Sequence, residues 1–316
     1  MKIVIGSRGS QLALWQANWV KDRLTSAGHE VVIEIIRTSG DKLQTYAPTE
    51  PLPASMAQIV AEAGTKGLFI KEIEEALLSG RVDLAVHSLK DLPTTLPAGL
   101  VLAAVPPRED ARDVLITAGG ATLEQLPPGA CVGTSSPRRQ AQLLWLRPDL
   151  KPVPLRGNLT TRLRKLDSGD YAALVLAAAG IHRLGLRHRI TAYFDFDQIC
   201  PAVGQGALAI EIRQRDAELA RAVATLDDAM THLAVRAERA MLLRLGGGCQ
   251  VPIAAHANCE EGQLYLRGVV AATDGRRLVR AAASGSQGAP ESLGAAVAED
   301  LLTKGAGEIL QRPTER

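Results

Sequence analysis

The sequence predicts an α/β protein with two mixed α/β domains and a smaller α+β domain at its C-terminal end. Three observations predict this fold class. Short β-branched segments alternate with amphipathic segments up to about residue 200, an order typical of parallel sheets covered by helices. The Gly/Pro-rich segment Pro201–Gly206 then leads into another apolar strand. From about Asp228 the pattern changes to one long helix, three strands and a final helix.

The opening of the chain is a strand–helix–strand unit, which implies a parallel sheet. Ser10 caps its helix, and Gly28 stops it. The segment Tyr46–Gly64 has three prolines and no clear period, so we expect a mobile insertion there. In order, the predicted elements of this part are strand Lys2–Gly6, a helix to about Ala27, strand Glu30–Arg37, helix Leu68–Ser79 and strand Val82–His87.

A second α/β series begins near Asp113, and the strand after its Gly/Pro crossover most economically returns to the first domain. The C-terminal elements then form the α+β domain. The predicted elements are strands Cys131–Thr134, Val153–Leu155, Ala172–Leu176, Ala207–Ile212, Val251–Ala257, Gln263–Val270 and Arg277–Ala283, with helices Arg138–Leu146, Thr160–Leu166, a segment to about Leu184, Thr231–Leu245 and Pro290–Leu302.

Composition excludes several classes of protein. The 316 residues are 46% hydrophobic and 22% charged with a formal net charge of +2, which is typical of a globular chain and not of a general polyanion binder. The cysteines and histidines show no CxxC or HExxH spacing, so no metal is expected. The chain opens on a strand, and no apolar run could span a membrane. We therefore expect a cytoplasmic protein that binds neither nucleic acid nor membrane. We also expect a monomer, which these observations do not themselves predict.

Arginines gather where a predicted strand ends and a helix begins. Arg8 follows the first strand, Arg138 and Arg139 open a later helix, and Arg156 precedes another helix that carries Arg162. Ligands of open α/β sheets bind at this edge, helix N-termini attract anions, and arginine matches carboxylate or phosphate geometry. Any single arginine is more often a solvated surface charge. Their recurrence predicts a small ligand with several carboxylates or phosphates.

One acid stands at the same predicted edge. Asp91 lies just beyond strand Val82–His87 and next to Lys90. Because it would face an arginine-rich cleft, it should stay ionised, and a lone carboxylate there suits stabilisation of a cationic intermediate or proton transfer. An aspartate that only caps the next turn is the alternative. Asp83, inside the strand, is a weaker candidate.

Cys249 follows three consecutive glycines in Leu245-Gly-Gly-Gly-Cys-Gln-Val-Pro-Ile253. The glycines end the preceding helix and allow another molecule to approach the main chain closely. A thiol in such a loop is accessible and becomes a nucleophile once ionised. A lone cysteine is more often buried, but the arginines and the acid favour a reactive thiol.

A polycarboxylate cleft, one acid and one exposed cysteine together resemble the porphobilinogen deaminase (hydroxymethylbilane synthase) family. The resemblance covers essentially the whole chain. The motifs that carry it are Leu12-Ala-Leu-Trp-Gln16, Lys66-Gly-Leu-Phe69, Ala85-Val-His-Ser-Leu-Lys-Asp-Leu-Pro93, Gly133-Thr-Ser-Ser-Pro-Arg-Arg-Gln140, Leu155-Arg-Gly-Asn158, Leu174–Gly180 with Arg183-Leu-Gly185, Pro201-Ala-Val-Gly-Gln-Gly206, and Glu238-Arg-Ala240 leading to Gly247-Gly-Cys-Gln-Val-Pro-Ile253.

The resemblance implies a transferase of tetrapyrrole biosynthesis with two domains similar to type II periplasmic binding proteins and a third that carries the cysteine loop. We expect these domains at residues 1–106 with 207–225, 107–206 and 226–316. One dipyrromethane cofactor would be joined through a thioether to Cys249. Four porphobilinogen units would be added head to tail with loss of ammonia, and linear hydroxymethylbilane would be released by hydrolysis. The acetate and propionate groups of each pyrrole account for the arginines, and a cationic azafulvene accounts for Asp91.

By position in these motifs, the resemblance implies a role for each candidate residue. Asp91 would be the catalytic carboxylate, and no residue would hold a metal. Besides Cys249, the cofactor-binding residues would be Ser88, Lys90, Thr134, Ser135, Ser136, Arg138, Arg139, Arg156 and Gly157. The substrate-binding residues would be Arg8, Ser10, Arg156, Arg162 and Gln205.

The chain departs from the family pattern at three places. The stretch before Gly64-Thr-Lys-Gly67 is longer than usual, and Glu62 stands where many members have a lysine, which leaves the role of a lid over the site open. Pro137 replaces a common leucine, which a first helical turn tolerates.

Two other classes of protein could use a similar cleft. A non-catalytic binding protein for a dicarboxylate or an amino acid would need neither Cys249 nor Asp91 and would not explain the third domain. A phosphate-binding transferase would normally show a P-loop and metal-binding carboxylates, and the sequence has neither pattern.

Overall fold

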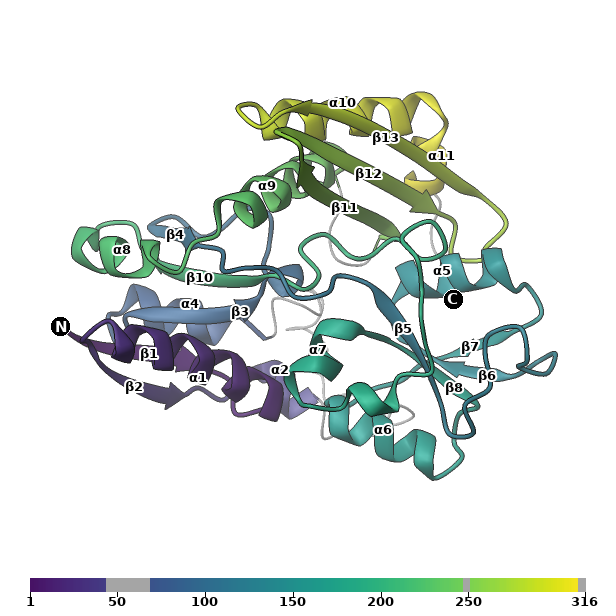
Figure 1. The fold of residues 1–316 in the computed structure, drawn as a ribbon, viewed down its shortest axis with the longest axis horizontal. Coiled ribbons are helices and arrows are strands. Elements are labelled where there is room, and N and C mark those ends of the chain that lie inside the picture. The colour runs from purple at the N-terminus through teal and green to yellow at the C-terminus, as the bar shows by residue number, and fades with distance from the viewer. Residues whose placement is uncertain (44–68, 247–250, 312–316) are drawn as a thin grey trace. The chain divides into compact units, whose positions relative to one another are not determined.

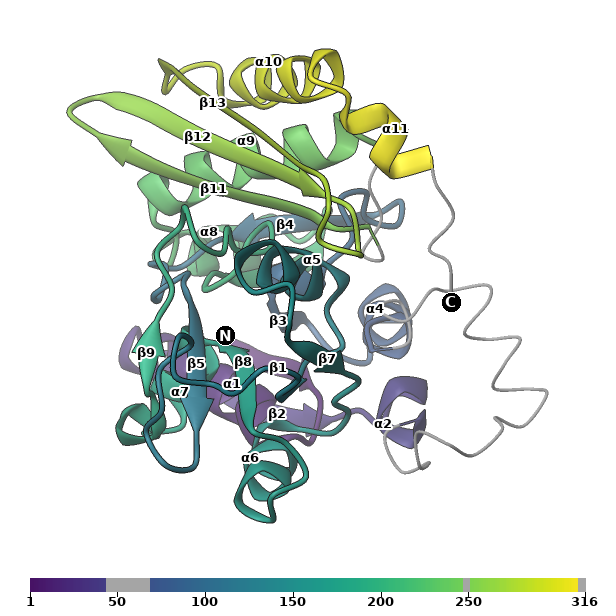
Figure 2. The same cartoon turned by 90° about the vertical axis from the view of Figure 1, so that its right-hand side faces the viewer.

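The computed structural model describes residues 1–43, 69–246 and 251–311 (Figures 1 and 2). The chain forms two compact units, Met1–Arg108 with Ala207–His232 and Glu109–Gly206 with Leu233–Arg316. Within the described ranges, the strands form two five-stranded sheets and one three-stranded sheet. No helix in these ranges is both long and apolar enough to cross a membrane.

The sheet of the first unit has the strand order β2-β1-β3-β10-β4. β1 (Lys2–Ser7) is parallel to β2 (Glu30–Ile35) and β3 (Leu84–Ser88). β10 (Leu208–Arg213) is antiparallel to β3 and to β4 (Leu100–Ala104). The prediction that the strand after the crossover returns to the first sheet is therefore confirmed. Its partner β4 was not predicted.

Helices cover both faces of this sheet because successive strand residues point to opposite sides. Helices α1 (Gln11–Ser26) and α8 (Ala217–Ala224) pack on the face that carries Ile3 and Ile5. Helix α4 (Lys71–Leu78) packs in a separate cluster, which includes the intervening strand residue Val4. Short helix α2 (Ser39–Leu43) follows β2.

The second unit contains a sheet of similar plan, with the order β7-β6-β8-β5-β9. β6 (Cys131–Gly133) is parallel to β7 (Lys151–Val153) and β8 (Ala173–Ala177), whereas β5 (Asp113–Thr117) is antiparallel to β8 and pairs with short β9 (Ala192–Tyr193). Its helices are α5 (Pro137–Leu146), α6 (Leu159–Asp167) and α7 (Ala178–Arg183), with a 3₁₀ turn at Arg187–Arg189.

The C-terminal part is an antiparallel sheet of β11 (Ile253–Glu260), β12 (Gln263–Ala271) and β13 (Leu278–Ser286). Helices α9 (Ala229–Arg244) and α10 (Pro290–Thr303) share one apolar cluster with it, and α11 (Ala306–Gln311) joins that cluster. Gly294 allows α10 to approach α9, since an added Cβ would lie 2.4 Å from the Ala237 carbonyl oxygen.

The fold-class prediction of two α/β domains and a smaller α+β domain is confirmed: there are two mixed sheets covered by helices, each with antiparallel pairing, and a small antiparallel sheet packed on helices. Several boundaries were wrong by a few residues, for example β11, predicted at Val251–Ala257. β9 and α8 were not predicted; they span only two and eight residues. The expected insertion Tyr46–Gly64 lies outside the described residues.

Candidate active site

Three predicted site residues of the first unit lie where β3 ends. Ser88 is the last residue of β3 and accepts a hydrogen bond from the Gln16 Nε2 atom at 2.8 Å. The chain then forms the 3₁₀ turn Leu89–Asp91. The Leu89 amide donates to the Ala207 carbonyl oxygen at 3.0 Å, so the return strand anchors this turn. Lys90 and Asp91 are half-buried on it.

Arg8 lies at the same carboxyl edge, because it follows β1 and β1 is parallel to β3. Its Nε and terminal nitrogens donate to Asp41 Oδ1 at 3.1 and 2.5 Å, and its guanidinium lies 4.2 Å from the centre of the Phe69 ring. Burial alone would raise the pKa of Asp41, but Arg8 and Thr38 hold that pKa below its ordinary value. An anion at Arg8 must therefore share the guanidinium with Asp41.

Ser10 is placed as the N-cap of α1, where its hydroxyl accepts the Ala13 amide at 3.3 Å. Asp83 is structural: its carboxylate accepts from the Val4 amide at 2.8 Å and from Arg213 at 3.1 Å. A serine cap keeps its own O–H available to donate, so Ser10 can serve helix and ligand together. Asp83 has no such freedom.

A buried titratable cluster lies beneath this edge. The His87 Nε2 atom, in β3, is 3.0 Å from Glu211 Oε2, in β10, and both side chains are almost fully buried. Burial, and then the charge of Glu211, raise the pKa of nearby Glu74 to about 7. One buried oxygen on each of Glu74 and Glu211 has no hydrogen-bond partner in the described structure. The charge of Glu211 therefore favours the protonated form of Glu74.

In the second unit, the predicted hydroxyl groups lie in the turn between β6 and α5, and each also has a structural partner. Thr134 Oγ1 accepts the Ser136 amide at 3.2 Å, and Ser136 caps α5 by accepting the Arg139 amide at 3.4 Å. Both keep an O–H to donate. Ser135 instead donates to the Leu155 carbonyl at 3.0 Å and accepts its amide at 2.8 Å, which ties this turn to the next loop. Pro137 takes the first helical turn, as expected.

Arg138 and Arg139 are buried and share one carboxylate, Asp113, at the start of β5. Asp113 Oδ2 lies 2.7 Å from Arg138, and Asp113 Oδ1 lies 2.7 Å from the Arg139 terminal nitrogen. Arg138 also donates to the Cys200 carbonyl oxygen at 2.5 Å. Gln205, fully buried, donates to Asp113 Oδ1 at 2.9 Å. The four side chains form one internal polar cluster.

Electrostatics keep this cluster ionised. Burial alone would raise the pKa of Asp113, but the two guanidiniums lower it well below its ordinary value. Burial lowers the pKa of Arg138, and Asp113 opposes that shift. Two cations against one anion leave a single net positive charge at the N-terminus of α5. The charge that this helix start offers to a ligand is therefore smaller than two adjacent arginines suggest.

Arg156 differs from these buried arginines. It is exposed before α6, and within the described ranges its side chain has no hydrogen-bond or ion-pair partner. Gly157 follows in the left-handed region with φ of 113°, and an added Cβ would lie 2.9 Å from Thr161. Arg162, half-buried one turn into α6, donates from Nε to the Gly157 carbonyl oxygen at 2.8 Å. The backbone conformation that Gly157 allows thus places the preceding residue, Arg156, at the surface.

Sequence reasoning missed two buried acids. Asp113 organises the arginine pair, and its signal was a charged residue opening the apolar run Asp113–Thr117. Glu238, in α9, is fully buried and accepts the Gly204 amide at 2.6 Å and the Ala257 amide at 2.8 Å. It therefore joins the crossover, α9 and β11. The signal was the position of Glu238 on the apolar face of a helix.

Cys249 lies outside the described residues. α9 ends before it, at Arg244, and β11 begins after it, at Ile253. Cys200 is not an alternative nucleophile, because burial raises the pKa of its thiol to about 12 and only the thiolate is nucleophilic. Within the described ranges, no group of three or more His, Cys, Asp or Glu side chains could hold a metal ion.

Comparison with known proteins identifies the family. The model for the dipyromethane cofactor binding domain of porphobilinogen deaminase matches residues 3–221, and the model for the C-terminal domain of the same enzyme matches residues 232–303. Relatives named porphobilinogen deaminase include one from Desulforudis audaxviator, 53% identical over 98% of this chain and 97% of that protein. Another, from Syntrophotalea carbinolica, is 51% identical over 97% of this chain and 94% of that protein.

Among solved structures, the periplasmic VFT2 domain of Bordetella pertussis BvgS is similar with a TM-score of 0.40 and 15% identity, covering 71% of this chain and 84% of that chain. The two family models together span almost the whole sequence, in the order expected from its motifs. This chain belongs to the porphobilinogen deaminase family.

Proposed function

We propose that this transferase of tetrapyrrole biosynthesis joins four porphobilinogen molecules head to tail onto a dipyrromethane primer on Cys249. Ammonia leaves at each addition, and hydroxymethylbilane is released by hydrolysis. One observation carries the proposal. The family's charged motifs occupy the carboxyl edges of parallel strands in both five-stranded sheets, with Arg8 and Asp91 on one and Arg156 on the other. That edge is where α/β sheets bind ligands.

The side chains at these edges fit a group that bears acetate and propionate. Arg156 offers an exposed guanidinium, and Thr134 and Ser136 offer hydroxyl protons beside the N-terminus of α5. Charge-assisted hydrogen bonds of this kind are the strong ones for carboxylates. Dipyrromethane, when bound, supplies the terminal pyrrole carbon to which each new ring is joined. We assign Arg156, Thr134 and Ser136 to its carboxylates, whereas Arg139 is bound to Asp113 and holds the start of α5 in place.

Asp91 carries the chemistry in this proposal. As the bond from the substrate methylene to the departing amine breaks, positive charge develops on the pyrrole nitrogen of the substrate. An ionised carboxylate placed there stabilises that charge most when the surrounding dipoles are already fixed. The turn that holds Asp91 is fixed by the Leu89 amide, bonded to the carbonyl oxygen of Ala207 just before β10, and by the Leu92 amide, bonded back to the Leu89 carbonyl oxygen, each at 3.0 Å. Lys90 and Arg8 supply the cations for the acidic side chains.

Other predicted ligands take a positioning role. Gln205 and Ser135 direct their hydrogen bonds into the protein, so we propose that they hold the crossover and the α5 turn in place without contacting substrate. Arg138 belongs with them, because its contacts are Asp113 and the Cys200 carbonyl. For Arg162, which donates from Nε to the Gly157 carbonyl oxygen, we keep the substrate-binding role that its place in the family motif implies.

The decisive experiment is the mass of the purified chain together with its activity. We expect a covalent dipyrrole adduct on the Cys249 peptide, and its loss with all activity in Cys249→Ser. Cys131→Ser, which removes an exposed thiol from β6, should keep both. An active preparation whose chain is unmodified would contradict the proposal.

A second variant tests the catalytic role of Asp91 separately from the attachment of the primer. Asp91→Asn should retain the adduct yet lose turnover by about 10²-fold or more, the usual contribution of a positioned acid or base. Substantial remaining turnover would remove Asp91 from this role. The dicarboxylate-binding alternative predicts neither the adduct nor this loss.

Domain division, location and assembly complete the proposal. Three separate sheets support domains at residues 1–106 with 207–225, 107–206 and 226–316. We propose a cytoplasmic monomer that binds no nucleic acid. Light scattering of the purified chain should give a mass near 33.5 kDa, and a concentration-dependent rise to twice that mass would contradict a monomer.

A further inference from the structure

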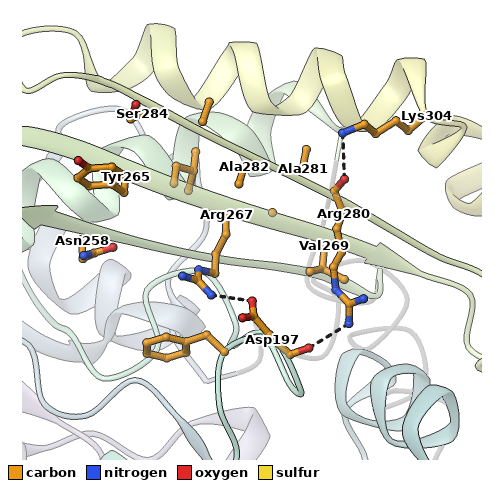
Figure 3. A pocket seen from close by; sticks show the side chains of 14 residues that line it. Asp197, Asn258, Tyr265, Arg267, Val269, Arg280, Ala281, Ala282, Ser284 and Lys304 are labelled. Carbon is orange, nitrogen blue, oxygen red and sulfur yellow. Dashed lines mark hydrogen bonds and ion pairs between the residues drawn. The ribbon is translucent and has the colours of Figure 1, made fainter.

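A pocket of about 440 Å³ lies on the C-terminal sheet, on the face turned away from α9 and α10 (Figure 3). The register places Tyr265 between Asn258 and Ser284, and Arg267 between His256 and Ala282. The neighbouring residues Leu264 and Leu266 point into the core instead. None of the candidate active-site residues lines this pocket.

Two guanidiniums in the pocket are held by a single residue, Asp197. Arg267 donates to Asp197 Oδ1 at 2.8 Å, and Arg280 donates to the Asp197 carbonyl oxygen at 3.0 Å (Figure 3). Lys304 completes the cationic side by donating to the Arg280 carbonyl oxygen at 3.2 Å, while Asp300 neutralises its ammonium at 2.7 Å. Of the two arginines only Arg267 has a carboxylate partner, and that carboxylate is 90% exposed, whereas Arg280 is held by a main-chain carbonyl oxygen alone. This fixed, positive arrangement favours a further carboxylate.

Flat rings form the other side of the pocket. Phe196 is stacked on His256 with 3.9 Å between ring centres and 22° between planes, and Arg267 lies 5.6 Å from the Phe196 ring. Tyr265 is 39% exposed in the pocket. In the described structure, neither the Tyr265 nor the Ser284 hydroxyl has a hydrogen-bond partner. A ring that stacks on Tyr265 could therefore also receive hydrogen bonds at its edge.

We propose that this pocket is a second binding site for the substrate class of the enzyme, a pyrrole that bears acetate and propionate groups. One carboxylate binds between Arg267 and Arg280, the ring packs on Tyr265, and the other carboxylate meets the Ser284 side of the pocket. The inference rests on porphobilinogen being the substrate. The pocket volume falls within the range of about 300–1,000 Å³ typical of small-molecule sites. It holds one ring with its side chains, and four linked rings would extend well beyond it.

The test uses the cofactor-bearing enzyme and a pyrrole with acetate and propionate groups but no aminomethyl group, so that no turnover occurs. Backbone amide NMR shifts of residues 265–269 and 280–284 report the pocket directly. We expect saturable shifts with a dissociation constant of about 1 mM or below. Arg280→Gln should weaken this binding about tenfold, the usual effect of removing one partner of an arginine–carboxylate pair. The kcat of the Arg280→Gln enzyme should stay unchanged.

Arg276→Gln is the matched control, because Arg276 is exposed on the neighbouring turn and does not line the pocket. It should bind the probe as the unaltered enzyme does. Tyr265→Ser tests the ring contact independently and should also weaken binding. Sodium propionate, which has the carboxylate but no ring, should bind less tightly than the pyrrole acid. The proposal would be overturned by absent or unsaturable shifts, by an Arg280→Gln enzyme that binds the probe as tightly as the unaltered enzyme, or by propionate binding as tightly as the pyrrole acid. Loss of the Cys249 adduct, in contrast, would bear only on the catalytic assignment.

Discussion

Replacement of Asp113 by asparagine provides the sharpest test of the buried arginine cluster. Asp113 is fully buried, and Arg138 and Arg139 each lie 2.7 Å from one of its oxygens. The substitution keeps the shape of the side chain and removes its charge, so both guanidiniums lose their anionic partner. Breaking a buried ion pair by removing one partner costs about 3–5 kcal/mol, because an uncompensated charge stays buried.

The assay is urea unfolding followed by fluorescence and circular dichroism at pH 7. Glu291→Gln is the matched control, since it removes the acid from an arginine pair, Arg236–Glu291, whose side chains are 47% and 56% exposed. Exposed pairs contribute about 0–1 kcal/mol. We therefore expect Asp113→Asn to lower the free energy of unfolding by at least about 2 kcal/mol more than Glu291→Gln does.

The pH dependence follows from the sign of the pKa shift. The folded pKa of Asp113 is depressed below its ordinary value of 3.8, so its contribution is complete above that value and is lost as the pH falls further. The deficit of Asp113→Asn should thus be constant between pH 5 and pH 8. A loss below about 1 kcal/mol, or one equal to the control, would refute the idea that this carboxylate organises the two arginines.

Three further predictions concern other parts of the chain. The pKa of Glu74 is raised to about 7 from 4.5 by burial and a neighbouring acid, so the stability it confers should be complete below pH 4.5 and lost as the pH rises through 7. Glu74→Gln should therefore reduce the change in the free energy of unfolding over this pH range by about 1–2 kcal/mol, after allowance for the partial exposure of Glu74. Arg156→Gln should weaken substrate binding and leave Tm unchanged, whereas Arg138→Gln should destabilise by about 3 kcal/mol or more; a destabilised Arg156→Gln would contradict the exposed role of that arginine. Gly206→Ala, with φ of 87° and a new Cβ 2.2 Å from a backbone oxygen, should lower Tm more than Gly169→Ala, with φ of 83° and open space around it, and equal effects would exclude the clash.

Local pattern was sufficient for most of the fold. Alternation of strand and helix predicted the parallel strands, and the cap at Ser10 begins α1 where expected. β9 was missed because two residues are too few for a period to be recognised, and the five-residue strand β4 was missed as well. Their place in a sheet depends on neighbours distant in the chain, such as β10 beside β4.

The sequence predicted which types of residue occupy the site. It did not predict which of their side chains point into the protein and which are exposed. Arg138, Arg139 and Arg156 share the same local context, yet the first two are buried against Asp113 and the third is exposed. Gln205 was placed among substrate ligands, but its amide is directed at Asp113. Nothing near these residues in the sequence reveals the difference.

By itself, then, the order of motifs determined the family, the expected cofactor and the residues able to carry its chemistry, because those depend on residue types at short spacings. Only the tertiary structure decided which charges face inward. Asp113 lies 25 residues before Arg138, and strand pairing of β5 with β8 brings that carboxylate beneath α5. Burial there removes competing water, so one buried acid holds two cations that the sequence alone would leave exposed.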